Sequence, residues 1–206
     1  MRFRTIALAS GALLTTTLLL AGCAQNGTGG GMPGMDHGAT PMTTPSAGIG
    51  DFNSADEMFV TGMIPHHLQA IQMADLILGT DGVDPRVLDL AQQIKDAQGP
   101  EIETMTSWLA EWGIPYDDST SQGMGGMDHG DGMLSEADLI ALESATGIDA
   151  TRLFLEGMIG HHQGAVRMAQ SVIDNGQNPD VADLAQQILV GQTAEIATMQ
   201  DLLGTL

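Results

Sequence analysis

The stretch Phe59-Val-Thr-Gly-Met-Ile-Pro-His-His-Leu-Gln-Ala-Ile-Gln-Met-Ala74 occurs twice in this chain and returns as Phe154-Leu-Glu-Gly-Met-Ile-Gly-His-His-Gln-Gly-Ala-Val-Arg-Met-Ala169. Phe, Gly, Met, Ile, both His, Ala, Met and Ala keep their places at a constant offset of 95 residues, from Phe59 to Phe154. In the first copy, steps of three and four residues define one apolar stripe that is typical of a helix: Phe59, Met63, His66, Ala70, Met73 and Ile77. Both copies therefore place a pair of imidazoles on the buried side of a helix.

The N-terminal residues 1–22 are expected to be a targeting signal. Arg2 and Arg4 precede an apolar run that is too short to span a membrane comfortably. The following Leu20-Ala-Gly-Cys23 resembles the lipobox of bacterial lipoproteins, which implies cleavage before Cys23 and lipidation of this residue. The alternative is a plain secretory signal. Either way the chain is expected outside the cytoplasm, and the lipobox predicts a lipid-anchored protein of the cell envelope.

The charge of the chain excludes one class of partner. Its formal net charge is −20 at pH 7, with only 6 Lys and Arg residues. Such a chain repels phosphate backbones, so we expect no nucleic-acid binding, whereas its field attracts cations. Cys23 is the only cysteine, which rules out a disulfide within the chain.

The composition divides the chain into a tether and a helical domain. Residues 23–51 are rich in Gly, Pro, Thr and Ser and lack the apolar side chains of a core, which predicts a flexible tether. Residues 52–206 are expected to form one domain. Its parts are a first repeat at 52–112, a Met/His linker at 113–134 and a second repeat at 135–206.

The helix signals predict an all-α fold. The expected helices run from Asn53 or Ser54 to about Leu78 with a kink at Pro65, from Pro85 onward, from Ser135 to about Ala145, from Asp149 to about Ile173, and from Pro179 to Leu203. Two helical hairpins with one long connection between them predict an up-down four-helix bundle. A pseudo-twofold axis would then relate the hairpins and bring the two His pairs face to face.

The same faces carry side chains that are suited to a metal. A Met at position i and His at i+3 and i+4 project from one side of a helix, and thioether and imidazole are copper ligands. A buried carboxylate must coordinate an ion or accept a hydrogen bond from an imidazole. The predicted metal ligands are Met63, His66, His67, Glu101 and Met105 in the first repeat, and Met158, His161, His162, Glu195 and Met199 in the second. The alternative is a metal-free polar network that fixes the register of the helices.

Two short Met/His clusters outside the predicted helices form a second set of candidates. They are Met32, Met35 and His37 in the tether, and Met124, Met127 and His129 in the linker. Both contain the sequence Met-Asp-His-Gly, and each precedes a hairpin. They resemble the soft-metal segments of bacterial copper-handling proteins, and the alternative is drift within Gly-rich sequence.

The segments Met63-Ile-Pro-His-His67 and Met158-Ile-Gly-His-His162 resemble the bacterial family called domain of unknown function 305. The resemblance covers about residues 52–206. It implies a ferritin-like helical bundle in an exported protein, and some members of the family are periplasmic copper-binding proteins. Gly62 and Gly157 stand where many members are expected to have a second Met.

The function that follows is a membrane-anchored lipoprotein that binds copper for storage, delivery or resistance. The implied partners are the metal ion, the membrane through Cys23, and a second copy or a copper-handling protein. The alternatives are a metal-free structural module and a ferritin-like di-iron oxidase. An oxidase site needs more carboxylates, because Met63 and Met158 stand where a Glu-x-x-His motif has Glu. Nothing in the sequence requires an enzyme.

Overall fold

The computed structural model describes residues 51–116 and 132–206, and these ranges contain helices and no strand. The helices are α1 (Ser54–Leu78), α2 (Pro85–Trp112), α4 (Glu136–Ser144), α5 (Gly147–Asn175) and α6 (Pro179–Leu203). This confirms the all-α prediction. The predicted signal peptide, Cys23 and both Met-Asp-His clusters lie outside the described residues.

Local capping explains most of the helix boundaries. The Asn53 side chain accepts hydrogen bonds from the amides of Ala55 and Asp56, and Asp84 and Asn178 cap helices that begin with Pro. The start of helix α5 differs from the prediction, because the helix begins at Gly147 and not at Asp149. The Gly147 amide donates to the Asp81 carbonyl at 3.0 Å, so a contact with the α1–α2 turn fixes this start. No side-chain cap fixes this start, because the Thr146 side chain forms no capping hydrogen bond.

The two prolines within helices do not end them. Helix α1 continues through Pro65 to Leu78, as the sequence predicts, and α2 continues through Pro100; the kink predicted just ahead of His66 stays a prediction. A helix that is packed along its length can tolerate the loss of one backbone hydrogen bond.

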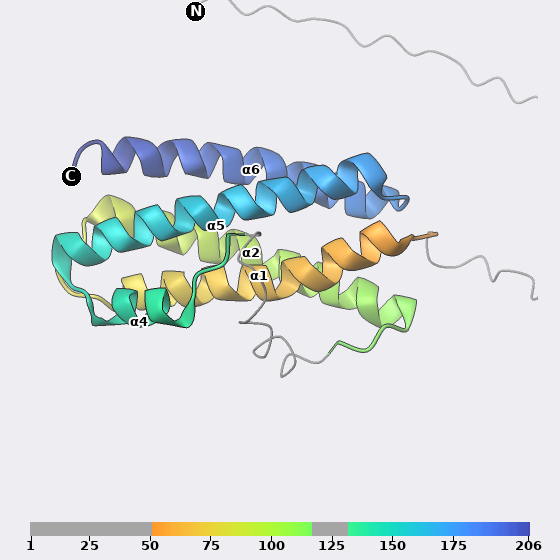
Figure 1. Cartoon of the computed structure of the whole chain (residues 1–206), viewed down its shortest axis with the longest axis horizontal. Coiled ribbons are helices and arrows are strands. Elements are labelled where there is room, and N and C mark those ends of the chain that lie inside the picture. Colours follow the sequence, from red (N-terminus) through yellow and green to blue (C-terminus); the bar gives the residue numbers. More distant parts are fainter. Residues whose placement is uncertain (1–50, 117–131) are drawn as a thin grey trace, which may run out of the picture. The chain divides into compact units, whose positions relative to one another are not determined.

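The two hairpins meet through α1 and α5. Helix α1 packs against α2, α5 packs against α6, and α1 and α5 contact each other, while the short α4 lies against both (Figure 1). Figure 1 shows that α1 and α5 run in opposite directions and that the α1–α2 and α5–α6 turns lie at opposite ends. This is the arrangement expected for two hairpins related by a pseudo-twofold axis.

The core follows the same symmetry. Two clusters of buried apolar side chains fill the interior. Met63 and Met105 lie in one cluster, and their repeat equivalents Met158 and Met199 lie in the other. All four side chains are fully buried.

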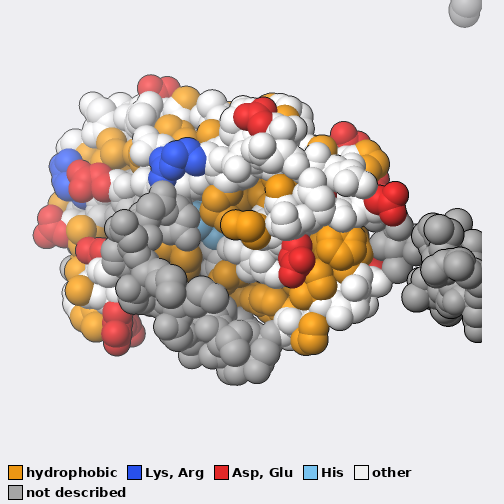
Figure 2. Space-filling view, turned by 45° about the vertical axis from the view of Figure 1, so that its right-hand side comes forward, with side chains coloured by type: hydrophobic (Ala, Val, Ile, Leu, Met, Phe, Trp, Pro, Cys, Tyr) orange, Lys and Arg blue, Asp and Glu red, His pale blue; other side chains and the backbone are white. Residues whose placement is uncertain are grey.

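Charged side chains are dispersed on one face of the domain (Figure 2). On the face drawn in Figure 2, acidic side chains are scattered among apolar and uncharged ones and do not form one patch. Among the described helices, none combines the length and the apolarity that crossing a bilayer requires.

Asp56 ties the start of α1 to the turn of the other hairpin. Its carboxylate accepts the amide of Asn53 at 2.8 Å, and it also accepts the amides of Gln177 and Asn178 at 2.9 and 3.2 Å. The side chain is fully buried. A Cβ at Gly176 would approach Asp56 Oδ1 to 2.5 Å, so the turn needs a glycine there. The equivalent residue in the second repeat is Thr151, whose hydroxyl only bonds the Gly147 carbonyl of its own helix, at 2.8 Å.

This asymmetry predicts different costs for equivalent substitutions. Asp56→Ala removes the acceptor of backbone amides in both hairpins and should lower the free energy of unfolding by about 2–4 kcal/mol. Thr151→Val at the equivalent position should cost less than about 1 kcal/mol, because no inter-hairpin bond is lost. Urea unfolding followed by circular dichroism measures both values. Equal costs for the two variants would contradict the role given to Asp56.

Candidate metal centre

Four buried imidazoles lie along the contact between α1 and α5. His66, His67, His161 and His162 have no exposed surface. The rings of His66 and His161 come from opposite helices, and their centroids lie 3.7 Å apart with an interplanar angle of 37°. Within each helix the neighbouring rings diverge, with centroid separations of 6.5 Å for His66 and His67 and 6.3 Å for His161 and His162. The predicted face-to-face meeting of the His pairs therefore occurs through one ring from each helix.

The central contact keeps the imidazole of His161 uncharged. Burial lowers the pKa of His161 well below its ordinary value of 6.5, and the neighbouring imidazoles of His66, His162 and His67 lower it further. Desolvation disfavours the charged form, and a second positive charge nearby would add repulsion. His161 is therefore neutral at physiological pH, which is the state that a metal-binding imidazole needs.

The two outer imidazoles are each held by a carboxylate from the neighbouring helix. His67 Nε2 lies 2.7 Å from Glu101 Oε2, on α2, and His162 Nε2 lies 2.7 Å from Glu195 Oε2, on α6. An ionised carboxylate can only accept, so Nε2–H is the donor in both pairs. In the neutral form of such a ring, Nδ1 carries a lone pair. In His67 and in His162, Nδ1 is buried and has no hydrogen-bond partner.

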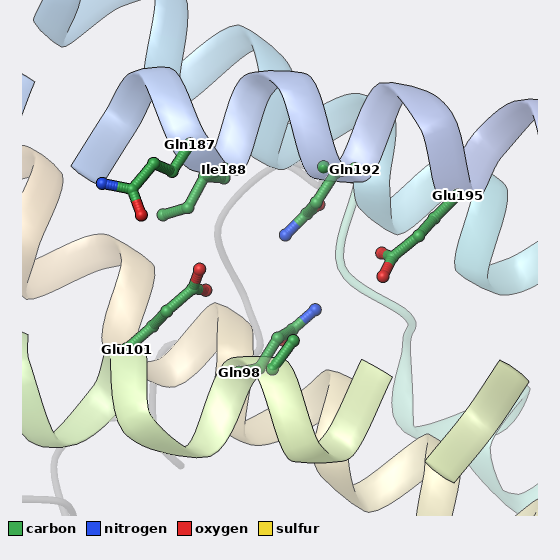
Figure 3. A pocket seen from close by; sticks show the side chains of 8 residues that line it. Gln98, Glu101, Gln187, Ile188, Gln192 and Glu195 are labelled. Atoms are coloured by element: carbon green, nitrogen blue, oxygen red, sulfur yellow. The ribbon is translucent and has the colours of Figure 1, made fainter. Parts of the chain in front are cut away.

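Two glutamines extend this polar region toward the surface between α2 and α6. Gln98 and Gln192 are 3% and 4% exposed. Both amide atoms of Gln98, and Oε1 of Gln192, lack a hydrogen-bond partner. Figure 3 shows the two amide groups pointing from their helices into the space between α2 and α6.

The predicted methionine ligands occupy the core on either side. Met63 and Met158 lie one helical turn before the His pairs, within apolar clusters. Two further methionines fill the space beside the repeat's glycines. A Cβ at Gly62 would lie 3.2 Å from Met168 Cε, and one at Gly157 would lie 3.4 Å from Met73 Cε. At each glycine, the end of a methionine side chain from the opposite helix therefore occupies the space that a larger residue would need. The sequence does not reveal this, because the pairs are far apart along the chain.

The structure brings the predicted residues together in pairs. Within residues 51–116 and 132–206, no group of three or more His, Cys, Asp or Glu is placed to hold a metal ion. What the repeat provides is a central pair of imidazoles flanked by two His–Glu pairs, with methionine sulfurs as additional donors in the adjoining core. The assignment of these residues as metal ligands stays a prediction.

The buried neutral His161 predicts a loss of stability in mild acid. Below pH 6.5 the unfolded chain binds a proton at this residue that the folded chain does not bind. The free energy of unfolding should therefore be retained above pH 6.5. It should fall as the pH drops toward the folded-state pKa, by up to about 1.4 kcal/mol per pH unit for this group. Urea unfolding of metal-free protein at several pH values measures the slope. His161→Leu should have a shallower slope, and an unchanged slope would contradict this account.

Comparison with known proteins places this architecture in a family. The model of the family described as domain of unknown function DUF305 matches residues 56–203. A DUF305 fragment from Deinococcus radiodurans is 34% identical, with a TM-score of 0.64, and the match covers 75% of this chain and 98% of that one. A DUF305 protein from Streptomyces coelicolor that is presumed to be secreted is 32% identical, with a TM-score of 0.65 and coverages of 74% and 93%.

A further similar structure was solved with metal. CopM in its Cu(I)-bound form is 32% identical, with a TM-score of 0.58, and the match covers 73% of this chain and 96% of that one. Structures of CopM bound to Cu(II) and to Ag are also similar to this chain. The comparison with curated proteins found no match. The family model spans most of the chain and includes both His pairs, so this protein belongs to the DUF305 family.

Proposed function

We propose that this protein is an exported, lipid-anchored metal-binding protein whose helical domain binds copper through imidazole nitrogens and methionine sulfurs. The observation that carries the proposal is the state of His67 and His162. In each, Nε2 is engaged by a glutamate while Nδ1 is buried without a partner. A carboxylate that orients an imidazole in this way is the usual support of a metal-binding His, because it fixes the tautomer and raises the basicity of the ring.

The chemistry of the surrounding donors favours copper over harder ions. Fully buried methionines adjoin both His pairs. Thioethers favour Cu(I), and imidazole binds copper in either oxidation state. CopM, which shares the fold at 32% identity, has been solved with Cu(I), with Cu(II) and with Ag. A di-iron site is disfavoured by the donor set, because Met63 and Met158 stand where such sites use carboxylates.

One observation favours a metal-free role as the competing function. Each His–Glu hydrogen bond joins two neighbouring helices, so the pairs could serve to fix the register of α1 on α2 and of α5 on α6. That role leaves Nδ1 of His67 and of His162 unsatisfied inside the protein, which typically costs about 1–3 kcal/mol per group. A bound ion would remove this cost, and we therefore prefer the metal-binding function.

The remaining predicted ligands would act outside the bundle. We include a second set of soft-metal ligands in the tether and linker: Met32, Met35, His37, Met124, Met127 and His129. Cys23 would carry the lipid that holds the protein at the membrane. Copper storage, delivery or resistance at the cell envelope is the role that this organisation suits.

Substitution of the supporting carboxylates tests the function of the bundle. The test uses the chain from residue 24 onward, in which the six tether and linker residues named above are replaced by Ser. It is exposed to equal Cu, Zn and Fe, and bound metal is measured by elemental analysis. We expect copper to be retained, and Glu101→Gln with Glu195→Gln should weaken its binding by about 10- to 100-fold. His67→Leu with His162→Leu should abolish it.

The matched control is Glu103→Gln, an exposed residue of α2 that should leave copper binding unchanged. If the bundle retains no metal, or if the His67/His162 variant binds copper as tightly as the parent, the His–Glu pairs are structural. The metal-free function then takes the place of the proposed one.

The lipid anchor has its own test. Cys23→Ser in the full chain should move the protein from the membrane fraction to the soluble fraction, because the lipid acceptor is lost. Helix content by circular dichroism should not change, since Cys23 precedes the helical domain. If the variant stays in the membrane fraction, the lipobox assignment is wrong.

A further inference from the structure

A small pocket opens between α2 and α6, and none of the buried imidazoles lines it. Its volume is about 50 Å³. Both helices contribute to its lining: Ala97, Gln98 and Glu101 come from α2, and Gln187, Ile188, Gly191, Gln192 and Glu195 come from α6. Three of these residues are repeat equivalents of three others, so the pocket lies across the pseudo-twofold axis. Figure 3 shows the glutamines between the two glutamates.

The polar part of the lining consists of carboxylate and carboxamide groups and carries negative charge, while Ala97 and Ile188 supply apolar surface. The carboxylates of Glu101 and Glu195 are 23% exposed. The carboxamides of Gln98 and Gln192 are more than nine-tenths buried and offer oxygens that no protein group engages. No lining residue is basic. A buried amide oxygen without a donor is costly, and a cation or water in the pocket would satisfy it.

The size of the pocket limits its ligand. One water molecule needs roughly 10–15 Å³ of such space. A pocket of about 50 Å³ therefore holds an ion with a few waters and excludes an organic substrate. Carboxylate and carboxamide oxygens are hard donors that accept hydrated cations, and they hold a soft ion less tightly than imidazole or thioether does.

We propose that this pocket is a transit site in which a partly hydrated metal cation is held by Glu101, Glu195, Gln98 and Gln192 before it reaches the imidazoles. The proposal rests on the proposed function. Its geometric basis is that each glutamate contacts both environments, since the carboxylates line the pocket and also lie 2.7 Å from the buried rings of His67 and His162. An ion in the pocket is thus one side chain away from each His pair, and transfer to softer donors would be downhill.

Closing the pocket without touching its donors tests the proposal. Gly191 lies on the α6 wall, is exposed, and has nothing within 4 Å of an added Cβ. Gly191→Leu should place an apolar side chain over the opening. Gly99→Leu is the matched control, because Gly99 also has open space at its Cβ but does not line the pocket. Both substitutions replace a helical glycine, but Gly99 precedes Pro100, where an added Cβ disfavours helical backbone, so circular dichroism checks the helix content of both variants.

The readout is the rate of Ag(I) uptake in the protein whose six tether and linker ligands are replaced. Rapid mixing, quenching with a chelator and elemental analysis give the rate, and overnight dialysis gives the amount bound at equilibrium. Gly191→Leu should slow uptake about tenfold or more, which corresponds to about 1.4 kcal/mol of added barrier. The equilibrium amount should be unchanged, and Gly99→Leu should match the parent.

Uptake by Gly191→Leu at the parent's rate would overturn the transit site while leaving the proposed function intact. If none of the three proteins retains Ag(I) at equilibrium, the proposed function fails and the transit site fails with it. Ala97→Leu closes the pocket from the α2 wall and gives an independent second variant, for use if Gly191→Leu loses helix content. It should slow uptake in the same way, and an unchanged rate would again overturn the proposal.

Discussion

An imidazole that is removed from solvent loses its hydrogen bonds to water, and the way in which the protein replaces some of them organises the domain. Four such rings lie fully buried where α1 meets α5. The outer two obtain a partner from the next helix, His67 from Glu101 and His162 from Glu195. These bonds set how α2 lies on α1 and how α6 lies on α5. They also decide which ring nitrogen is left with a lone pair, and so they join the packing of the bundle to its chemistry.

The duplication is strict in the centre of the domain and relaxed at its ends. Both hairpins have the same His–Glu pair, but Asp56 binds the opposite turn where its equivalent Thr151 does not. Gln69 clamps the backbone of Leu134 with two hydrogen bonds, of 3.0 and 2.7 Å. Its repeat equivalent is Gly164, which leaves room for the backbone at Gly132. The repeat symmetry is thus retained where the imidazoles meet. It is broken where the segment that connects the two hairpins is bound by Gln69 of α1 and passes beside Gly164 of α5.

The repeat and the helical periodicity were sufficient to predict the all-α fold, most helix boundaries and the meeting of the two His helices. The sequence could not tell which imidazole each glutamate contacts. His66 and His67 are adjacent in the chain, and only the packing of α2 on α1 determines that Glu101 contacts His67. The start of α5 was also missed, because a bond from Gly147 to Asp81 fixes it and residues this far apart leave no local signal. The open space between Gln98 and Gln192 depends on the separation of α2 from α6, which no pattern within one helix contains.

The central claim is that Glu101 and Glu195 hold the outer imidazoles as Nε2–H tautomers and leave Nδ1 for a soft metal ion. Nitrogen NMR of ¹⁵N-histidine-labelled protein, recorded before and after addition of Ag(I), reports on this directly. The account predicts Nε2–H tautomers for His67 and His162 in the metal-free protein. On addition of Ag(I), their Nδ1 resonances should shift while Nε2 stays protonated. Protonated Nδ1 in the metal-free protein, or Nδ1 resonances that do not respond to Ag(I), would contradict it.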